Sequence, residues 1–560
     1  MAKALATGSR PNSTTGAAPA AAVLSWTQSL LLAAFGAALL ALAFPPVSLS
    51  VLAWIALAPL CLVCLRAASG GQAFWSGYVA GAIFFAADCP WVAYTVRRYG
   101  GLSRPEAVLV FILFIALVGV FFALFTWIGY GLCRWAPLPW LTLPALWTAI
   151  EFLRTYVPLG GFPWDLVGYS QANHAGFMLS VTVAGVYGAG FLIAVENAVL
   201  ADAASHFSGW FSQAPQRGAR TAWAWPVAPA ITWFLVVGFA SFPFDPPRLQ
   251  PTTLRAVLVQ PDANPNAVWS DAAFARYLRR MEKLSHPGPR LRDDAPALVL
   301  WPESPAPLEY APEPQLQASV AGLTRSDNAE LLFGETALLH PSAPPRQQDP
   351  INAARLIQPD GLPGPRYAKR HLVPFGEYVP LPAWLRRWTG VRAMVSQVGD
   401  FVPGDKLTLF HLPAASGKNR RNVRPYTFGA LICYESIFPA LARQEVHAGA
   451  QWLVNLSDDG WYGNSAARPQ GLLMARVRAM ENRRWLLRDT NNGITAIIDP
   501  FGRVRARLPM GGVAALRGHF AARSGQTFYT EHGDWLPWLC TIFVGLMALA
   551  GGLRHRFRRV

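Results

Sequence analysis

The stretch GALICYESIF, residues 429–438, ends an apolar, β-prone run with a cysteine and continues at once with polar residues. Cys433 closes the run, and Tyr434 and Glu435 follow it. The other cysteines lie within or at the ends of long apolar runs, where cysteine behaves as a small hydrophobe: Cys61, Cys64, Cys89, Cys133 and Cys540. Cys433 has no evident disulfide partner, so the sequence leaves two interpretations open, a core residue or a reactive thiol.

The length and composition of the chain indicate a membrane protein with more than one domain. Its 560 residues exceed the size of an ordinary single domain. Charged residues make up 14% of the chain and hydrophobic residues 52%, whereas soluble proteins carry about 25% charged residues. The net charge of +16 comes without a zinc-ligand spacing, a helix-turn-helix signature or an aromatic RNA-binding motif. We therefore expect no nucleic-acid partner and assign much of the excess arginine to membrane topology.

Eight apolar runs approach the length of about 20 residues that a membrane-spanning helix requires. They lie at approximately 23–43, 49–65, 74–95, 106–130, 138–153, 175–200, 225–243 and 535–553. The first run is long and is followed by six more before a gap, so we interpret it as an uncleaved span rather than a signal peptide. The prediction is an α-helical membrane bundle of about eight transmembrane helices.

Arginine placement predicts how these spans are oriented. If the N-terminus is inside the cell, the cytoplasmic side carries Lys3, Arg10, Arg66, Arg134, Arg217, Arg220 and the terminal RHRFRR. The opposite short loops then carry only Arg97, Arg98, Arg104 and Arg154. This asymmetry favours cytoplasmic termini. The predicted organisation is a cytoplasmic tail (1–22), a seven-span region (23–244), an extracytoplasmic domain (245–530), and an eighth span with a basic tail (531–560).

The long segment between the last two spans has the pattern of an α/β domain. Buried-strand patterns occur at 254–260, 296–301, 329–334, 426–433 and 451–457, and helical spacing occurs at 436–450 and 468–482. Residues 490–504, TNNGITAIIDPFGRV, are typical of strands joined by NG and DPFG turns. Strands alternating with helices over this length predict an α/β domain with its own core.

Polar residues follow several of these strands. VLWPES places Glu303 after the second strand, YAKRHLVPFGE contains Lys369 and Glu377, and ICYES contains Cys433. Each of these residues has an alternative interpretation. Glu303 would also be at home in a solvated turn, and Lys369 would also be at home on the surface. Glu377 would also form an ion pair with a nearby arginine. Yet the chain has five lysines against 43 arginines, which makes a lysine here notable. Because strand ends in α/β sheets converge on one crevice, we expect a shared site.

The order Glu303, Lys369, Cys433, within WPES, YAKRHLVPFGE and ICYES, resembles the nitrilase (carbon–nitrogen hydrolase) superfamily. Together with the apolar runs, the whole chain resembles the apolipoprotein N-acyltransferase family, a membrane-embedded branch of that superfamily. Three further segments are similar to that family's pattern: CPWVAYTVRRYGG (89–101), EFLRTYVPLGGFPWDLVGYSQ (151–171) and MARVRAMENRR (474–484). The chain departs from the pattern at Asp458, near Gly471 and at Arg483, where asparagine, histidine and glycine are common.

The resemblance implies an α-β-β-α sandwich fold and acyl transfer through a cysteine thioester. Cys433 is then the nucleophile, Glu303 the general base, and Lys369 the ammonium that stabilises the oxyanion. Supporting roles are expected for Glu377, Glu435 and the backbone N–H of Tyr434. The donor would be a membrane phospholipid, with phosphatidylethanolamine expected. The acceptor would be the α-amino group of a diacylglyceryl apolipoprotein. No metal or organic cofactor is expected, and nothing implies an oligomer.

The same resemblance suggests where the substrates bind. Trp269, Trp384, Trp388 and Trp461 are the candidate substrate-binding residues. The Trp-bearing stretch 379–401 has the mixture of apolar residues and arginines typical of an interfacial lid, and ordinary packing on the domain is the alternative. Residues 160–171 suggest a re-entrant floor below the site. Glu151 and Arg154 have two interpretations, an ion pair with each other or a contact with a lipid headgroup.

Two other functions fit parts of the sequence. A membrane-anchored amidase or nitrilase hydrolysing a C–N bond would use the same triad, but a single anchor would suffice for it. A transporter or assembly factor with a decayed domain would have no need of an intact Glu303, Lys369 and Cys433.

The expected location is the bacterial inner (plasma) membrane, with the domain facing the periplasm.

Overall fold

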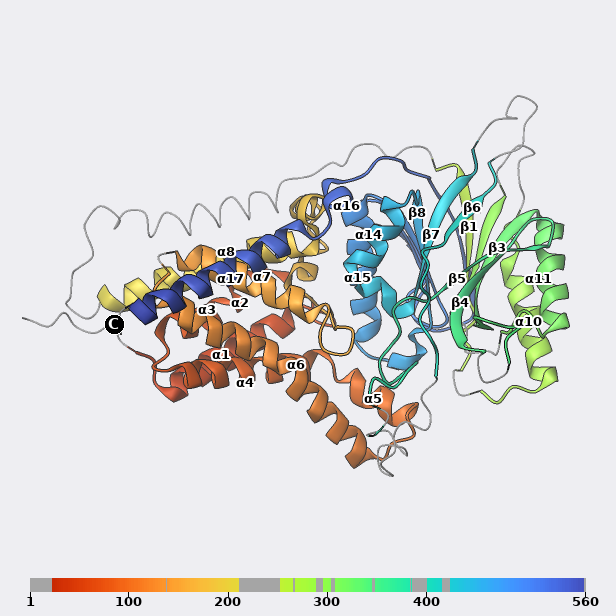
Figure 1. The fold of residues 1–560 in the computed structure, drawn as a ribbon. Helices are drawn as coiled ribbons and strands as arrows, with labels where there is room; N and C mark the ends of the chain where they lie inside the picture. Colours follow the sequence, from red (N-terminus) through yellow and green to blue (C-terminus); the bar gives the residue numbers. More distant parts are fainter. Residues whose placement is uncertain are drawn as a thin grey trace, which may run out of the picture.

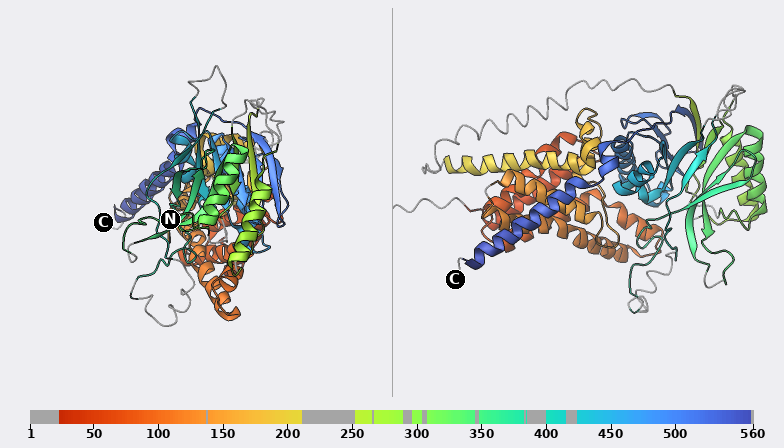
Figure 2. Two further views of the ribbon diagram at one scale, coloured as in Figure 1. Left: turned by 90° about the vertical axis from the view of Figure 1, so that its right-hand side faces the viewer. Right: turned by 45° about the horizontal axis from the view of Figure 1, so that its top comes forward.

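The chain folds into a bundle of apolar helices joined end to end with an α/β domain (Figures 1 and 2). The computed structural model describes residues 23–136, 138–210, 252–264, 267–288, 296–303, 308–344, 348–382, 384, 400–414 and 424–557. The last helix returns to the bundle after the α/β domain is complete and ends away from that domain (Figure 1).

Nine α-helices form the described part of the bundle. They are α1 (Trp26–Leu42), α2 (Ala53–Ala56), α3 (Ala58–Arg66), α4 (Gly70–Asp88), α5 (Trp91–Arg98), α6 (Arg104–Cys133), α7 (Pro139–Arg154), α8 (Val181–Trp210) and α17 (Trp535–Phe557). Short 3-10 turns, η1 (Ser50–Leu52), η2 (Val167–Gln171) and η3 (Phe177–Ser180), connect some of them. Six of the predicted apolar runs coincide with helices in whole or in part, and the run at 225–243 lies outside the described residues.

The remaining predicted run, 74–95, is not one continuous helix. It divides into α4 and α5, whose axes are bent by 59°. The break falls at Cys89–Pro90, because a proline has no backbone N–H to continue the ladder of α4.

By length and composition, three helices among the described residues are long and apolar enough to cross a membrane, or up to four if the bent pair counts as one span. The three are Arg104–Cys133, Phe177–Ser205 and Trp535–Gly552. The segments Trp26–Leu42 and Ser50–Arg66 are apolar but shorter, and α7 has 16 residues. The described helices therefore account for fewer spans than the eight predicted.

The α/β domain contains two six-stranded sheets. The outer sheet has the order β12 (Ala514–Phe520), β1 (Leu254–Gln260), β2 (Ala297–Trp301), β3 (Ala329–Leu338), β4 (Pro350–Ile357), β5 (Pro363–Ala368). The inner sheet has the order β11 (Val504–Arg507), β10 (Ala496–Ile498), β9 (Trp485–Thr490), β8 (Trp452–Ser457), β7 (Tyr426–Ile432), β6 (Leu409–Leu412). The strands β1, β2 and β3 are parallel to one another, and so are β7, β8 and β9. All the predicted strands are confirmed.

Helices cover the outer face of each sheet. Helices α10 (Asp271–Ser285) and α11 (Pro314–Asp327) pack on the outer sheet, and α14 (Pro439–His447) and α15 (Ala467–Asn482) pack on the inner sheet. Figure 1 shows the four layers in sequence, with α14 and α15 nearest the bundle. This is the α-β-β-α sandwich that the resemblance implied. The predicted helix at 436–450 begins only at Pro439, because Cys433–Ile437 form a 3-10 turn, η5.

Local chemistry explains several helix ends. The hydroxyl of Ser270 accepts a hydrogen bond from the N–H of Ala273 and so caps α10. Helix α11 ends at Asn328, which adopts the left-handed conformation with φ of 45° that asparagine tolerates well. In the bundle, Ser69 caps α4 by accepting from the N–H of Gln72.

Aromatic side chains fill the space between the two sheets. Trp452 is fully buried there, with ring centroids 5.0 Å from Phe428 and 5.1 Å from Phe520. Phe428 and Trp452 are opposite each other on neighbouring strands of the inner sheet, whereas Phe520 belongs to the outer sheet. One indole therefore joins the two sheets.

We predict that Trp452→Ala lowers the free energy of unfolding by about 3–5 kcal/mol, because the lost burial and the cavity both cost stability. Thermal unfolding of the detergent-solubilised protein measures this change. Trp384→Ala is the control, since 63% of Trp384 is exposed and such a change stays within about 0.5 kcal/mol. Equal effects of the two substitutions would contradict this account of the core.

Candidate active site

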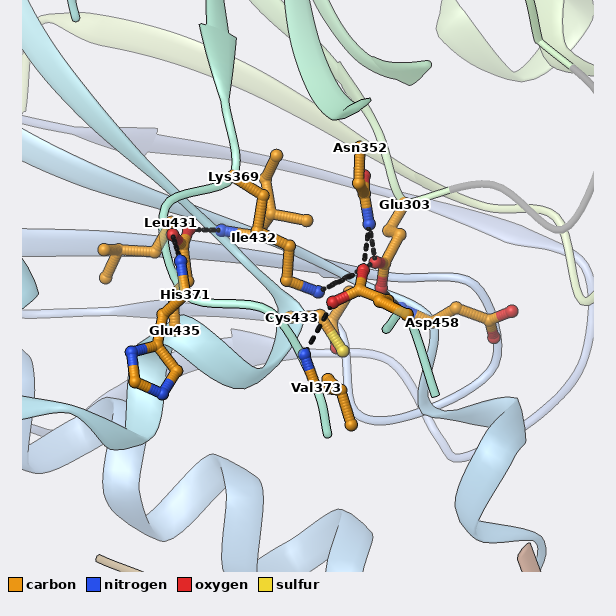
Figure 3. A network of polar contacts seen from close by, with 12 residues as sticks. Glu303, Asn352, Lys369, His371, Val373, Leu431, Ile432, Cys433, Glu435 and Asp458 are labelled. Atoms are coloured by element: carbon orange, nitrogen blue, oxygen red, sulfur yellow. Dashed lines mark hydrogen bonds and ion pairs between the residues drawn. The ribbon is translucent and has the colours of Figure 1, made fainter. Parts of the chain in front are cut away.

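The two sheets bring Glu303, Lys369 and Cys433 together. Glu303 follows β2 and Lys369 follows β5 in the outer sheet, and Cys433 follows β7 in the inner sheet. The ammonium of Lys369 lies 3.5 Å from Oε1 of Glu303. Figure 3 shows the sulfur of Cys433 beside these groups, with the three side chains converging from different strands.

Glu303 is held through both carboxylate oxygens. Its Oε1 accepts a hydrogen bond of 2.7 Å from Nδ2 of Asn352, and its Oε2 accepts one of 3.0 Å from the backbone N–H of Asp458. Gly334 on β3 allows this turn to approach the sheet, because a Cβ atom there would lie 2.8 Å from the Cα of Glu303. The carboxylate is thus fixed from both sheets.

Lys369 is buried between two carboxylates. Only 1% of its side chain is exposed, and its Nζ lies 2.8 Å from Oε1 of Glu377. The same oxygen of Glu377 accepts from Nδ2 of Asn352 at 2.7 Å, and its other oxygen accepts from the N–H of Val373 at 2.8 Å. Burial alone lowers the pKa of Lys369, but the charges of Glu377 and Glu303 outweigh it and raise the pKa above its ordinary value. The lysine therefore stays protonated at neutral pH.

Cys433 opens the η5 turn in an uncommon backbone conformation. Its φ is +52°, in the left-handed region that residues other than glycine rarely adopt. Burial raises the pKa of the thiol, the charge of Glu303 raises it further, and Lys369 lowers it. Burial and Glu303 prevail, so the resting residue is a thiol. A thiol needs a base before it attacks, because the thiolate is the nucleophile.

Glu435 braces the turn that carries the thiol. Its Oε1 accepts hydrogen bonds from the hydroxyl of Tyr367 (2.8 Å) and from the N–H groups of Arg370 (2.7 Å) and His371 (3.1 Å). Its Oε2 accepts from the N–H of Ile432 at 2.7 Å. The carboxylate therefore connects the turn at Cys433 to the segment that follows Lys369, as Figure 3 shows for the backbone contacts.

The predicted floor, residues 160–171, lies between the bundle and the η5 turn. The hydroxyl of Tyr434 donates to the carbonyl of Gly161 at 3.1 Å, and Nε1 of Trp164 donates to Oε1 of Gln470 at 3.0 Å. Arg154 donates to the carbonyls of Phe162 and Trp164, so its guanidinium shapes this segment.

Glu151 also shapes the floor segment. Its Oε1 accepts a hydrogen bond of 2.8 Å from the N–H of Val167. Both Glu151 and Arg154 are buried in the protein. Hydrogen bonds from Arg154 and to Glu151 therefore hold the floor segment from inside the bundle.

The four predicted tryptophans occupy different places. Trp269 packs on Tyr277, with ring centroids 5.2 Å apart, in the outer helix layer and not beside the thiol. Trp461 is 41% exposed and lies 4.6 Å from the ring of Tyr99 near α5. Trp384 is exposed. Trp388 and most of the predicted lid, 383 and 385–399, lie outside the described residues.

Sequence analysis missed Asn352, which donates to Glu303 and Glu377 at once. Its only signal in the sequence is an asparagine inside PINAARLI, the strand β4, since asparagine is depleted from strands. The backbone N–H of Asp458 was also missed, because a backbone donor leaves no mark in a sequence.

The three departures from the family pattern have local explanations. Oδ1 of Asp458 accepts from Gly460 and Asn491, and burial raises the pKa of its carboxyl to about 7. Arg483 occupies the left-handed position that ends α15, with φ of 51°, where glycine is favoured. Its guanidinium lies 4.5 Å from the ring centre of Phe501. A Cβ at Gly471 would lie 3.3 Å from Nη2 of Arg488, so that position is tightly packed.

Comparison with known proteins covers both parts of the chain. Residues 36–199 match the apolipoprotein N-acyltransferase N-terminal domain, and residues 296–512 match the carbon-nitrogen hydrolase domain. Among solved structures, an amidase from Nesterenkonia sp. is 16% identical and covers 51% of this chain and 94% of its own, with a TM-score of 0.35.

The curated relatives that match nearly the whole chain share one name. The apolipoprotein N-acyltransferase of Geobacter metallireducens is 32% identical over 527 residues, which cover 92% of this chain and 94% of that protein. The apolipoprotein N-acyltransferase of Methylococcus capsulatus is 32% identical over 524 residues, which cover 93% and 95%. Since one relationship spans both the helical bundle and the α/β domain, the chain belongs to the apolipoprotein N-acyltransferase family.

Proposed function

We propose that this enzyme transfers a fatty acyl chain to apolipoproteins through a thioester on Cys433, with Glu303 as general base and Lys369 as oxyanion donor. The observation that carries the proposal is the convergence of a buried thiol, a carboxylate and an ammonium held 3.5 Å from that carboxylate. A membrane bundle joined to this site suits two substrates that are both anchored in lipid.

The first half-reaction forms the thioester. Glu303 accepts the proton of the thiol as the sulfur attacks an ester carbonyl of the phospholipid. Negative charge develops on the carbonyl oxygen, and the ammonium of Lys369 and the backbone N–H of Tyr434 stabilise it. The ester C–O bond then breaks. The lysophospholipid leaves as an alcohol with the proton that Glu303 returns.

The second half-reaction forms an amide. The α-amino group of the diacylglyceryl cysteine attacks the thioester, and Glu303 accepts the proton of the amine. The C–S bond breaks, the sulfur regains a proton, and the acyl chain remains on the lipoprotein. The same two oxyanion donors serve both steps. Water must stay out, because it would hydrolyse the thioester.

Glu377 and Asn352 prepare Lys369 and Glu303 for these roles. Glu377 lies 2.8 Å from the ammonium and so keeps it charged and fixed in direction. Asn352 donates one hydrogen bond to each carboxylate, both of 2.7 Å, which reduces the repulsion between them. Glu435 has a structural role, since its four described hydrogen-bond partners are on the strand and segment around the turn.

The arginine asymmetry and the apolar runs support the proposed location, orientation and number of spans, and the family resemblance implies the donor. We propose phosphatidylethanolamine as donor, an inner-membrane location with the α/β domain in the periplasm, and eight spans. The proposed domain limits remain 1–22, 23–244, 245–530 and 531–560. A substrate contact at Trp461 is supported by its position in the 3-10 turn η6 (Asp459–Tyr462), which directly follows Asp458, whose N–H donates to Glu303.

We predict that Cys433→Ala abolishes acyl-enzyme formation, because no other group supplies the sulfur. Glu303→Gln and Lys369→Ala should each lower the rate by at least about 10³-fold, since members of such a triad act as a unit. Incubation with a phospholipid carrying labelled palmitate, followed by mass analysis of the Cys433 peptide, measures the intermediate.

The control for this experiment is Cys540→Ala, which changes a cysteine in α17 and should leave the labelling unchanged. A membrane amidase would accumulate no lipid-derived acyl group on Cys433. Labelling that survives in Cys433→Ala would refute the proposed nucleophile.

We predict opposite changes in thiol reactivity from the two charged partners. The charge of Glu303 raises the pKa of Cys433 and that of Lys369 lowers it. Glu303→Gln should therefore move the pH profile of iodoacetamide alkylation to lower pH, and Lys369→Met should move it to higher pH. Both variants should nevertheless lose acyl transfer. A shift of the Glu303→Gln profile to higher pH would contradict this account, because it would mean that the charge of Glu303 does not raise the pKa of the thiol.

A further inference from the structure

A buried ion pair lies where α15 meets the bundle. Arg478 and Glu481 on α15 are both fully buried, with Nε of Arg478 3.0 Å from Oε2 of Glu481. Figure 1 shows α15 in the layer that faces the bundle. A buried ion pair is a weak source of stability, because the cost of removing two charges from water offsets their attraction. Its further contacts indicate a different role.

Glu481 completes a broken helix of the bundle. Ala184 and Gly185 interrupt α8 with non-helical backbone angles, and Gly185 has φ of 63° and ψ of −171°. Backbone N–H groups that follow such a break have no acceptor within the helix. The N–H of Val186 instead donates to Oε1 of Glu481 at 2.8 Å. The carboxylate thus fastens the catalytic domain to α8.

Arg478 connects this junction to the nucleophile turn through Tyr169. Its Nη2 donates to the hydroxyl of Tyr169 at 3.0 Å. The hydroxyl in turn donates to the carbonyl of Ile437 at 3.2 Å, and Ile437 is the last residue of the turn that begins at Cys433. Arginine has no acceptor, so the Tyr169 hydroxyl must accept from it, and its own proton is directed to Ile437.

The turn needs such support because it carries both the thiol of Cys433 and the backbone N–H of Tyr434. It begins with Cys433 at a positive φ of +52°, a conformation that surrounding contacts must maintain. Its next N–H, that of Tyr434, is the proposed oxyanion donor. Tyr434 contacts the bundle through Gly161, and Tyr169 contacts the far end of the turn. Both contacts come from the same bundle segment.

We propose that Tyr169 is a positioning residue of the acyl transfer, which fixes the turn of residues 433–437 through the carbonyl of Ile437 and thereby aims the backbone N–H of Tyr434 at the oxyanion. Arg478 and Glu481 hold Tyr169 in place. This inference rests on the proposed function, since it assigns a role in stabilising the same tetrahedral intermediate.

Tyr169→Phe tests the proposal, because it removes one oxygen and keeps the ring. Losing an oxyanion donor outright costs about 10²–10³ in rate, so displacing it should slow both half-reactions by roughly tenfold. The concentration of donor phospholipid at half-maximal rate should change by less than about twofold. Alkylation of Cys433 by iodoacetamide should keep its rate and pH profile, because displacement of iodide develops no oxyanion.

Tyr187→Phe is the matched control. Tyr187 is equally buried, and its hydroxyl lies 2.6 Å from that of Thr155 within the bundle. Among the described residues, it makes no hydrogen bond to the turn of residues 433–437. We expect it to leave both half-reactions within about twofold of the unchanged enzyme, since its contact does not reach an oxyanion donor. Thermal unfolding of both variants shows whether they remain equally stable.

The outcomes separate this inference from the proposed function. If the unchanged enzyme forms no acyl group on Cys433, the proposed function fails. If it does, and Tyr169→Phe either keeps its full rate or slows alkylation as much as acylation, the positioning role is refuted. Equal slowing by Tyr187→Phe and Tyr169→Phe refutes the positioning role as well, because the effect would then come from a general loss of rigidity in the bundle.

Discussion

The site depends on a lysine ammonium that has been removed from water and is compensated by two carboxylates. Burial of Lys369 favours its neutral form, and Glu377 and Glu303 reverse that preference. Glu377 and Glu303 would repel each other in turn, and Asn352 donates to both. Removing any one of these groups leaves a buried charge or donor without its partner, which is the costly situation for polar groups in a protein interior. At this end of the outer sheet, the charges of Lys369, Glu377 and Glu303 therefore stabilise one another in the protein interior.

The balance of these charges also explains why the thiol stays protonated until a substrate is present. One ammonium faces two carboxylates, so a thiolate would add a further negative charge to the same volume. Transfer of the proton from Cys433 to Glu303 avoids that cost, because it moves the negative charge without increasing it. Lys369 then faces the thiolate, the neutral acid of Glu303 and the carboxylate of Glu377. For the proposed acyl transfer, the charge count of the site therefore calls for a general base, as does the burial that raises the pKa of Cys433.

Sequence reasoning found those parts of the molecule that local pattern determines. Strand ends in an α/β chain point to one edge, so Glu303, Lys369 and Cys433 were identified without knowledge of which strands pair. The pattern did not show that the residues come from two different sheets, nor that Asn352 bridges the carboxylates, because both depend on how β2, β4 and β7 are arranged in space. The packing of Trp269 on Tyr277 of α10 also left no mark in the sequence, and its role in substrate binding stays a prediction. The contact from Tyr169 to Ile437 joins positions 268 residues apart, and no local signal records it.

The turn that carries Cys433 is supported by the helical bundle as well as by the α/β domain. The η5 turn belongs to the α/β domain by sequence, yet Tyr434 and Ile437 pack in the same hydrophobic cluster as the bundle helices. If the α/β domain alone supported this turn, the turn would be free to move with respect to the helices of the bundle. Besides the contacts of Glu435, the turn has hydrogen bonds to residues 161 and 169 of the bundle, so the positions of the sulfur and of the Tyr434 N–H are set relative to the bundle. Under the proposed function, the bundle therefore does more than anchor the α/β domain, because it supports the turn that carries the nucleophile.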